Sequence, residues 1–168
     1  MDFSDATARF TILAFSGLLI AAAASDWKHF RVPNRYSLAL LALYPSYVIA
    51  SGGNVEWMGG LIYGAVAFGV GFLLFTLRLC GGGDVKLFAA VTLWAGPTWF
   101  MAMLFYTAVA GGIMAGGLWL NHRFKRTTVP ANLLYASRDL KASKQPMPYA
   151  VAIAVGGLFV ALQLLARV

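Results

Sequence analysis

Long stretches without a charged side chain constrain this fold more than any other feature of the sequence. The clearest are 10–25, 36–55, 57–77, 87–121 and 149–166. A transmembrane helix needs about 20 mostly apolar residues, so these stretches are close to the length that crosses a bilayer. Charged residues make up only 11% of the chain, against about a quarter in a typical water-soluble domain. The sequence therefore predicts an all-α, polytopic membrane protein.

The stretch 87–121 is too long for one ordinary helix, and Gly96-Pro97 divides it, because proline has no amide N–H and clashes with the preceding turn. The expected helices, within a single domain at 1–168, are then 8–25, 36–53, 57–78, 84–95, 98–120 and 149–167, with a basic loop at 121–148. This division places 11 of the 13 Lys and Arg residues on one side of the membrane. Cytoplasmic loops carry such an excess, so we expect six transmembrane helices with both termini on the extracytoplasmic side.

The net charge of +7 favours contacts with lipid headgroups rather than nucleic acid, since basic residues in a membrane protein usually report its orientation. One cysteine, Cys80, excludes an internal disulfide, and we expect it to be a small buried apolar residue. With two histidines there is no Cys/His cluster at metal-ligand spacing. We expect neither a metal nor a cofactor, and the sequence assigns no oligomeric state.

Five tryptophans lie near the ends of the predicted helices. An aromatic belt at the membrane interface explains this placement better than a substrate-binding box does. The residues are Trp27, Trp57, Trp94, Trp99 and Trp119.

Two of the six acidic residues need an explanation. Asp26 directly follows the first apolar stretch, and Asp84 directly precedes the fourth helix, so both are expected at the cytosolic end of the bundle. Acidic residues at membrane depth are costly and tend to mark function. The other four lie in exterior segments or in the basic loop: Asp2, Asp5, Glu56 and Asp139.

A purely structural role is open for each of the two. Asp26 could pair with Lys28 or Arg31, while Asp84 could pair with Lys86 or accept the free N–H groups that begin its helix. Taken together, two carboxyl groups at one depth also suit acid–base chemistry. One, ionised, can activate water as a general base, and the other, protonated, can donate to a leaving amine. The run Gly81–Gly83 before Asp84 leaves room for an extended peptide beside its carboxyl group.

The two sequence motifs around these acids resemble those of type IV prepilin peptidases, which are GxGD-type intramembrane aspartyl proteases. The first motif is Asp26 followed by Pro33-Asn34 with basic residues between, and the second is Gly81-x-Gly83-Asp84-x-Lys86. The resemblance implies that Asp26 and Asp84 are the catalytic pair. It implies supporting or site-shaping roles for Gly81, Gly83, Lys86, Lys28, Arg31, Pro33 and Asn34. A weaker match is Pro148-Tyr149 at the start of the last helix.

The resemblance further implies a function in the bacterial inner membrane. The substrate would be a prepilin, with a short basic leader and a hydrophobic segment, cleaved at the cytosolic face. Longer family members have a cytosolic methyltransferase region with paired cysteines, which is absent here. We therefore expect peptidase activity without N-methyltransferase activity, as in the enzymes of Flp, or tight-adherence, pilus systems.

Two other interpretations remain. Proteases of the presenilin or signal-peptide-peptidase type share GxGD, but they pair it with a Tyr-Asp motif, whereas Asp26 follows Ser25. A small transporter or a pilus-assembly scaffold would use the acids without proteolysis. Transporters often have internal repeats and acids near the bilayer midplane, and the sequence has neither feature.

Overall fold

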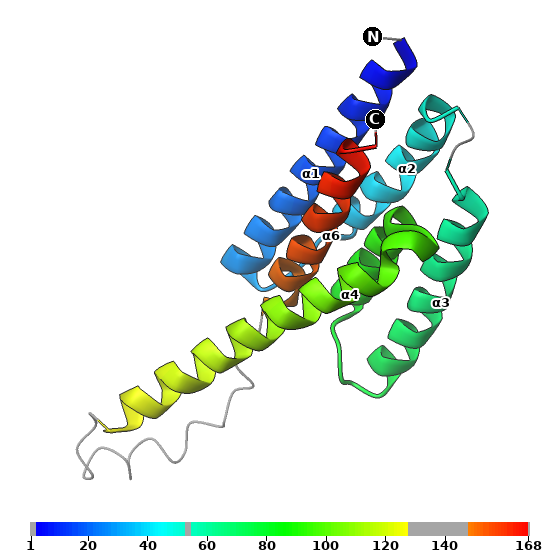
Figure 1. The fold of residues 1–168 in the computed structure, drawn as a ribbon. Coiled ribbons are helices and arrows are strands. Elements are labelled where there is room, and N and C mark those ends of the chain that lie inside the picture. The colour runs from blue at the N-terminus through cyan, green and yellow to red at the C-terminus, as the bar shows by residue number, and fades with distance from the viewer. Residues whose placement is uncertain (1–2, 53–54, 128–147, 168) are drawn as a thin grey trace.

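The computed structural model of the chain describes residues 3–52, 55–127 and 148–167. These residues are all-α, as predicted, and no strand occurs among them (Figure 1). The elements are α1 (Phe3–His29), α2 (Asn34–Ala50), α3 (Trp57–Thr76), α4 (Gly82–Thr127) and α6 (Tyr149–Leu165).

The long helix α4 reverses direction at Gly96. There φ is 56° and ψ is −169°, a conformation outside the helical region, and Pro97 follows. The first half of α4 packs along α3, from Val85 beside Gly71 to Pro97 beside Gly59. After the reversal the second half runs back along α6, and Figure 1 shows the two halves as separate helical segments. The sequence predicted this division correctly at Gly96-Pro97.

The last helix, α6, lies in the middle of the bundle and contacts both α1 and α4. A Cβ atom built on Gly157 would lie 2.6 Å from Leu19 of α1 and 3.0 Å from Val91 in the first half of α4. On the adjacent residue Gly156 it would lie 2.7 Å from the Met103 carbonyl in the second half. The absence of side chains at these two positions lets three helical segments approach α6 closely, which is the usual way that membrane helices pack.

Trp94 is at the centre of the core rather than at the membrane interface. It is 3% exposed, its ring stacks on Phe15 and Tyr47 at centroid distances of 4.3 and 5.2 Å, and its indole N–H donates to the Leu40 carbonyl at 3.1 Å. The aromatic-belt prediction was wrong for this residue, because position along the sequence does not show which side of a helix is enclosed. Trp27, by contrast, is 66% exposed.

The ends of α1 and of α4 extend beyond the sequence prediction for one physical reason. The apolar stretches indicated only the part of each helix that is apolar enough to lie in lipid. A helix continues beyond that part as long as its residues still favour the helical conformation. Thus α1 includes Lys28, and α4 continues to Thr127, so the first seven residues of the predicted loop at 121–148 are helical. Most of that loop, 128–147, lies outside the described residues. Cys80 lies in the connection after α3 and is exposed rather than buried.

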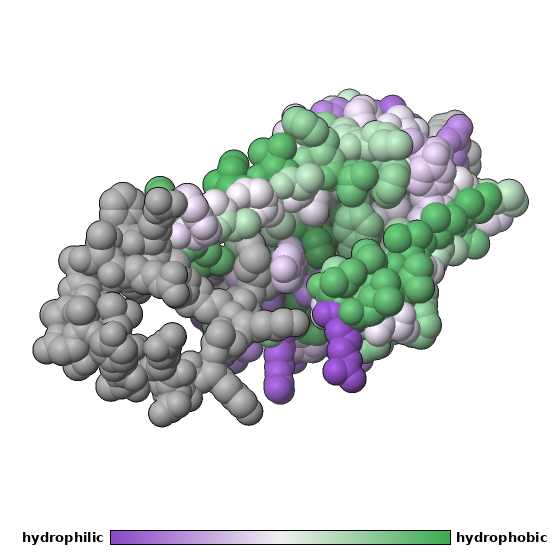
Figure 2. All heavy atoms as spheres, turned by 90° about the horizontal axis from the view of Figure 1, so that it is seen from below, coloured by the Kyte–Doolittle hydropathy of each residue, from purple (hydrophilic) through white to green (hydrophobic). Residues whose placement is uncertain are grey.

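Length and composition allow three helical stretches of the described chain to cross a membrane: Ser4–His29, Trp57–Thr76 and Gly82–Leu120, with Tyr149–Leu165 a shorter apolar helix. Helix α3 packs mainly against α4, and it leaves large apolar side chains such as Val66 and Leu73 60% exposed. Figure 2, a view from below, shows this apolar surface in green on the right, beside hydrophilic groups in purple. Such a surface is stable in lipid and not in water, so the chain is an integral membrane protein.

Candidate active site

Asp26 and Asp84 line one cavity of about 460 Å³ at the end of the bundle where α1 ends and α4 begins. Their carboxyl groups are near enough for their charges to interact. The cavity is built from the end of α1, the connection to α2 and the glycine run before α4. Its lining consists of Asp26, Phe30, Arg31, Val32, Pro33, Asn34, Gly81, Gly82, Gly83 and Asp84.

Asp26 is held by the beginning of α6. The residue lies in the last turn of α1 and is only 4% exposed. Its Oδ2 accepts a hydrogen bond of 2.9 Å from the backbone N–H of Ala150. The first amides of a helix have no partner within the helix and attract negative charge, and α6 begins at Tyr149 after Pro148. Ala150 was not among the predicted site residues. The one sequence signal near it was Pro148-Tyr149, which indicated where the last helix begins but not that its first amides contact Asp26.

Asp84 lies in the first turn of α4 and is partly buried. The ion pairs that would give the acids a structural role are not formed within the described residues, since neither Asp26 nor Asp84 pairs with Lys28, Arg31 or Lys86. Lys86 instead donates to the Asn34 side-chain oxygen at 3.1 Å. The carboxyl group of Asp84 is therefore available to whatever enters the cavity.

The two sequence motifs dock directly on each other. A Cβ atom at Gly83 would lie 2.9 Å from the Val32 carbonyl oxygen, closer than side chains approach in real structures. At Gly81 a Cβ atom would lie 2.8 Å from Oδ2 of Asp84. Glycine is thus required at Gly83 for the backbone to approach the first motif, whereas a side chain at Gly81 would displace the Asp84 carboxyl group. The Lys86–Asn34 hydrogen bond joins the motifs at a second point.

Phe30 ends α1 and turns the chain into the cavity wall. Its φ of 51° is left-handed, which is uncommon for a residue with a side chain, and its N–H donates to the Asp26 carbonyl at 2.8 Å. The turn places Arg31 and Pro33 in the lining. Lys28, the remaining predicted site residue, is exposed on the last turn of α1 and does not line the cavity.

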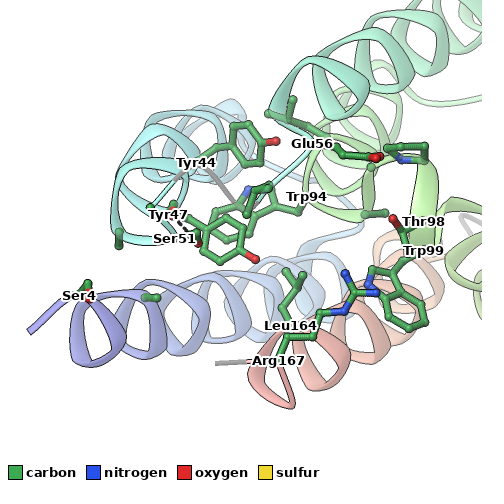
Figure 3. A pocket seen from close by; sticks show the side chains of 18 of the residues that line it. Ser4, Tyr44, Tyr47, Ser51, Glu56, Trp94, Thr98, Trp99, Leu164 and Arg167 are labelled. Carbon is green, nitrogen blue, oxygen red and sulfur yellow. Dashed lines mark hydrogen bonds between the residues drawn. The ribbon is translucent and has the colours of Figure 1, made fainter. Parts of the chain in front are cut away.

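A larger cavity, about 640 Å³, lies at the opposite end of the bundle, beside both chain ends (Figure 3). Tyr47 and Trp99 line it, and the Arg167 guanidinium stacks over the Trp99 ring at 4.8 Å. Its acidic lining residues are Asp5, which is partly exposed, and Glu56, which is exposed. Size alone therefore does not identify the active site, because the smaller cavity contains Asp26, which is almost fully withdrawn from solvent, whereas neither acid of the larger cavity is buried.

The smaller cavity has the groups that acid–base chemistry needs. One carboxyl group can accept a proton from water while the other donates a proton to a leaving group, and close carboxyl groups readily share one proton. The described residues contain no group of three His, Cys, Asp or Glu side chains that could hold a metal ion. The arrangement thus defines an integral membrane protein with a paired-carboxyl site at one end of its helical bundle.

Comparison with known proteins agrees with this class. The model of the type IV leader peptidase family matches residues 13–116, a range that contains both Asp26 and Asp84. The chain belongs to this family, which confirms the resemblance found in its motifs. It is 28% identical over 155 residues to the prepilin leader peptidase/N-methyltransferase of Bacillus subtilis (strain 168), an alignment covering 89% of this chain and 54% of that protein. The chain thus spans about half the length of this relative. No solved structure is significantly similar to it.

Proposed function

We propose that the protein is an aspartyl endopeptidase of the bacterial inner membrane that removes the leader peptide from prepilins of the Flp type. The observation that carries this proposal is the shared cavity of Asp26 and Asp84, in which the two motifs of the chain contact each other. Family membership supports the reaction class, since the curated relative is a prepilin leader peptidase. The substrate is a basic leader joined to a hydrophobic segment.

The proposed topology has six membrane crossings with both termini outside. The helical segments are α1, α2, α3, the two halves of α4, and α6. The reversal at Gly96 supports this number of crossings. Ser4 and Arg167 line the same cavity, so the start of α1 and the residues after α6 lie at the same end of the bundle, as an even number of crossings requires. The positive-inside rule then assigns the Asp26 and Asp84 end to the cytosol, where a leader peptide is accessible.

In the proposed mechanism Asp26 is the general base and Asp84 the general acid. Burial of Asp26 disfavours its charged form, and the Ala150 N–H that donates to it acts against this effect, whereas no hydrogen bond to the Asp84 carboxyl group is formed within the described residues. Asp26 takes a proton from water as the water oxygen attacks the scissile carbonyl carbon. Asp84 gives its proton to the amide nitrogen as the C–N bond breaks. A proton transferred from Asp26 to Asp84 restores the starting state.

The test is the processing of an Flp-type prepilin by purified enzyme in lipid vesicles. Asp26→Asn and Asp84→Asn keep the side-chain shape but cannot transfer the proton, so each lowers the cleavage rate by at least about 100-fold. Glu56→Gln, which also removes one carboxylate but at the opposite end of the bundle, is the matched control and retains the wild-type rate. Wild-type cleavage by either Asn variant, with its thermal stability intact, contradicts the two-carboxyl mechanism.

A further inference from the structure

An apolar groove of about 580 Å³ begins at Asp84 and continues into the membrane-embedded part of the molecule. One wall is α3, the other is the second half of α4, and the floor consists of the first half of α4 and the start of α6. The lining residues used below are Val66 of α3, Leu104 and Gly111 of α4, Ala152 of α6, and Cys80 and Asp84 at the mouth.

The walls of the groove have helical periodicity. Phe100, Leu104, Thr107 and Gly111 are spaced by four, three and four residues, so they form one face of α4. The α3 wall, from Ile62 to Leu74, is about 18 Å long at 1.5 Å per residue. This length is a little over half of the roughly 30 Å hydrocarbon core of a bilayer. The groove is therefore about as long as three turns of an apolar helix.

The two ends of the groove differ. At the end far from Asp84, the rings of Tyr63 and Phe100 meet edge to face at 5.2 Å between centroids and narrow the groove. At the mouth, Asp84 lines both the groove and the candidate active site. Small residues line the groove where the second half of α4 lies beside α6, since a Cβ atom on Gly111 would be 3.7 Å from the Cβ of Ala152. Small residues are what allow helix backbones to approach in lipid.

We propose that this groove binds the hydrophobic segment of the substrate, as an apolar helix that begins directly after the cleaved bond. This inference rests on the proposed function, because the scissile bond must lie between Asp26 and Asp84. A chain cleaved there continues into the groove without a gap, since Asp84 belongs to both cavities. Asp84 at the mouth, with Asp26 in the adjoining cavity, also suits a basic leader. The occupant is therefore a peptide segment rather than a lipid chain.

Two substitutions fill the groove, and each has a matched control. Gly111→Leu projects into it, whereas Gly112→Leu places the same side chain on the next residue, outside the groove and with nothing within 4 Å. Val66→Trp narrows it from the α3 side, whereas Leu73→Trp alters a residue of the same helix that is equally exposed but does not line it. We expect the two groove variants to raise the KM for a vesicle-embedded prepilin at least about tenfold. The two control variants keep the wild-type KM.

The single cysteine of the chain gives a second readout. Cys80 is exposed at the mouth of the groove, so a prepilin with one cysteine just after its cleavage junction is expected to form a disulfide with it under mild oxidation. Asp84→Asn enzyme holds the uncleaved substrate for this measurement. The expected yield falls severalfold with Gly111→Leu but not with Gly112→Leu.

The outcomes separate the two proposals. If wild-type enzyme does not cleave prepilin, the proposed function fails, while the disulfide with Cys80 still reports whether the hydrophobic segment occupies the groove. If wild-type enzyme cleaves prepilin and the groove variants match it in both KM and disulfide yield, the groove proposal is overturned. A groove occupied only by lipid gives that second result.

Discussion

At the residue scale, Asp26 and Asp84 were predicted as site residues because they are charged and lie beside apolar stretches. Their contacts in the structure differ. Asp26 accepts a hydrogen bond from Ala150, while Asp84 lies beside the glycine run. The contacts of each residue in that run explain why the motif has glycine at its third position and a variable residue at its second. A Cβ atom at Gly83 would meet the Val32 backbone, whereas one at Gly82 would meet only the ring edge of Phe75 at 3.2 Å. The second position of the motif is thus more tolerant than the third.

This difference predicts unequal effects of alanine in the glycine run. Gly83→Ala forces the two motif segments apart and is expected to lower kcat/KM for prepilin cleavage at least about tenfold, because small displacements of catalytic groups are costly. Gly82→Ala requires only a shift of Phe75, a side chain that is 45% exposed, and is expected to stay within about twofold of the wild-type value. Steady-state kinetics on the two variants measure both effects. Equal losses would show that the contact with Val32 does not position the site.

At the element scale, the break in α4 decides where each half of that helix lies. With the reversal at Gly96, the first half packs against α3 and carries Asp84, while the second half packs against α6 and forms one wall of the groove. A continuous helix would separate these surfaces. The break needs both of its residues, since proline prevents an uninterrupted helix and glycine adopts the positive φ.

Substitution of the reversal glycine should therefore destabilise the fold. At φ 56° and ψ −169° the backbone is in a region essentially restricted to glycine, so Gly96→Ala is expected to cost about 1–3 kcal/mol. Thermal unfolding in detergent micelles measures this as a lower Tm. Gly112→Ala, within the regular part of α4 and in open space, is the control and should leave Tm unchanged or slightly higher, because alanine favours helix over glycine. An equal Tm for Gly96→Ala and the wild type would mean that the reversal is not strained by a side chain.

At the scale of the whole molecule, the bundle has two chemically different ends. One end has the Asp26 and Asp84 cavity, and the other has the cavity lined by Tyr47, Glu56 and Arg167. The proposed topology gives each end a different side of the membrane.

Cysteine labelling tests that assignment. Cys80 is the natural cysteine near the candidate active site and is exposed, so a membrane-impermeant maleimide should label it in inverted inner-membrane vesicles and not in intact cells with a permeable outer membrane. Glu56→Cys in a Cys80→Ser background should give the opposite pattern, since Glu56 is exposed at the other end. Detergent-solubilised protein labels both and serves as the control. Labelling of both positions from one side of the membrane would exclude the six-crossing topology.

The sequence by itself determined the fold class, the break at Gly96-Pro97 and the family. These depend on local properties, because apolar length, proline geometry and motif spacing are written in consecutive residues. Helix ends were less predictable, since a helix that leaves the lipid continues as far as Thr127 although its residues have become polar.

Only the tertiary structure decided which groups meet. It showed that Lys86 binds Asn34 rather than Asp84, that the α6 amide of Ala150 holds Asp26, and that Trp94 is enclosed by α1 and α2. It also showed the groove that leads away from Asp84. The physical reason is the same in each case. These contacts join residues that are distant in the chain. In helices that are apolar on all sides, no local sequence pattern indicates which side faces a neighbouring helix, so only the packing decides it.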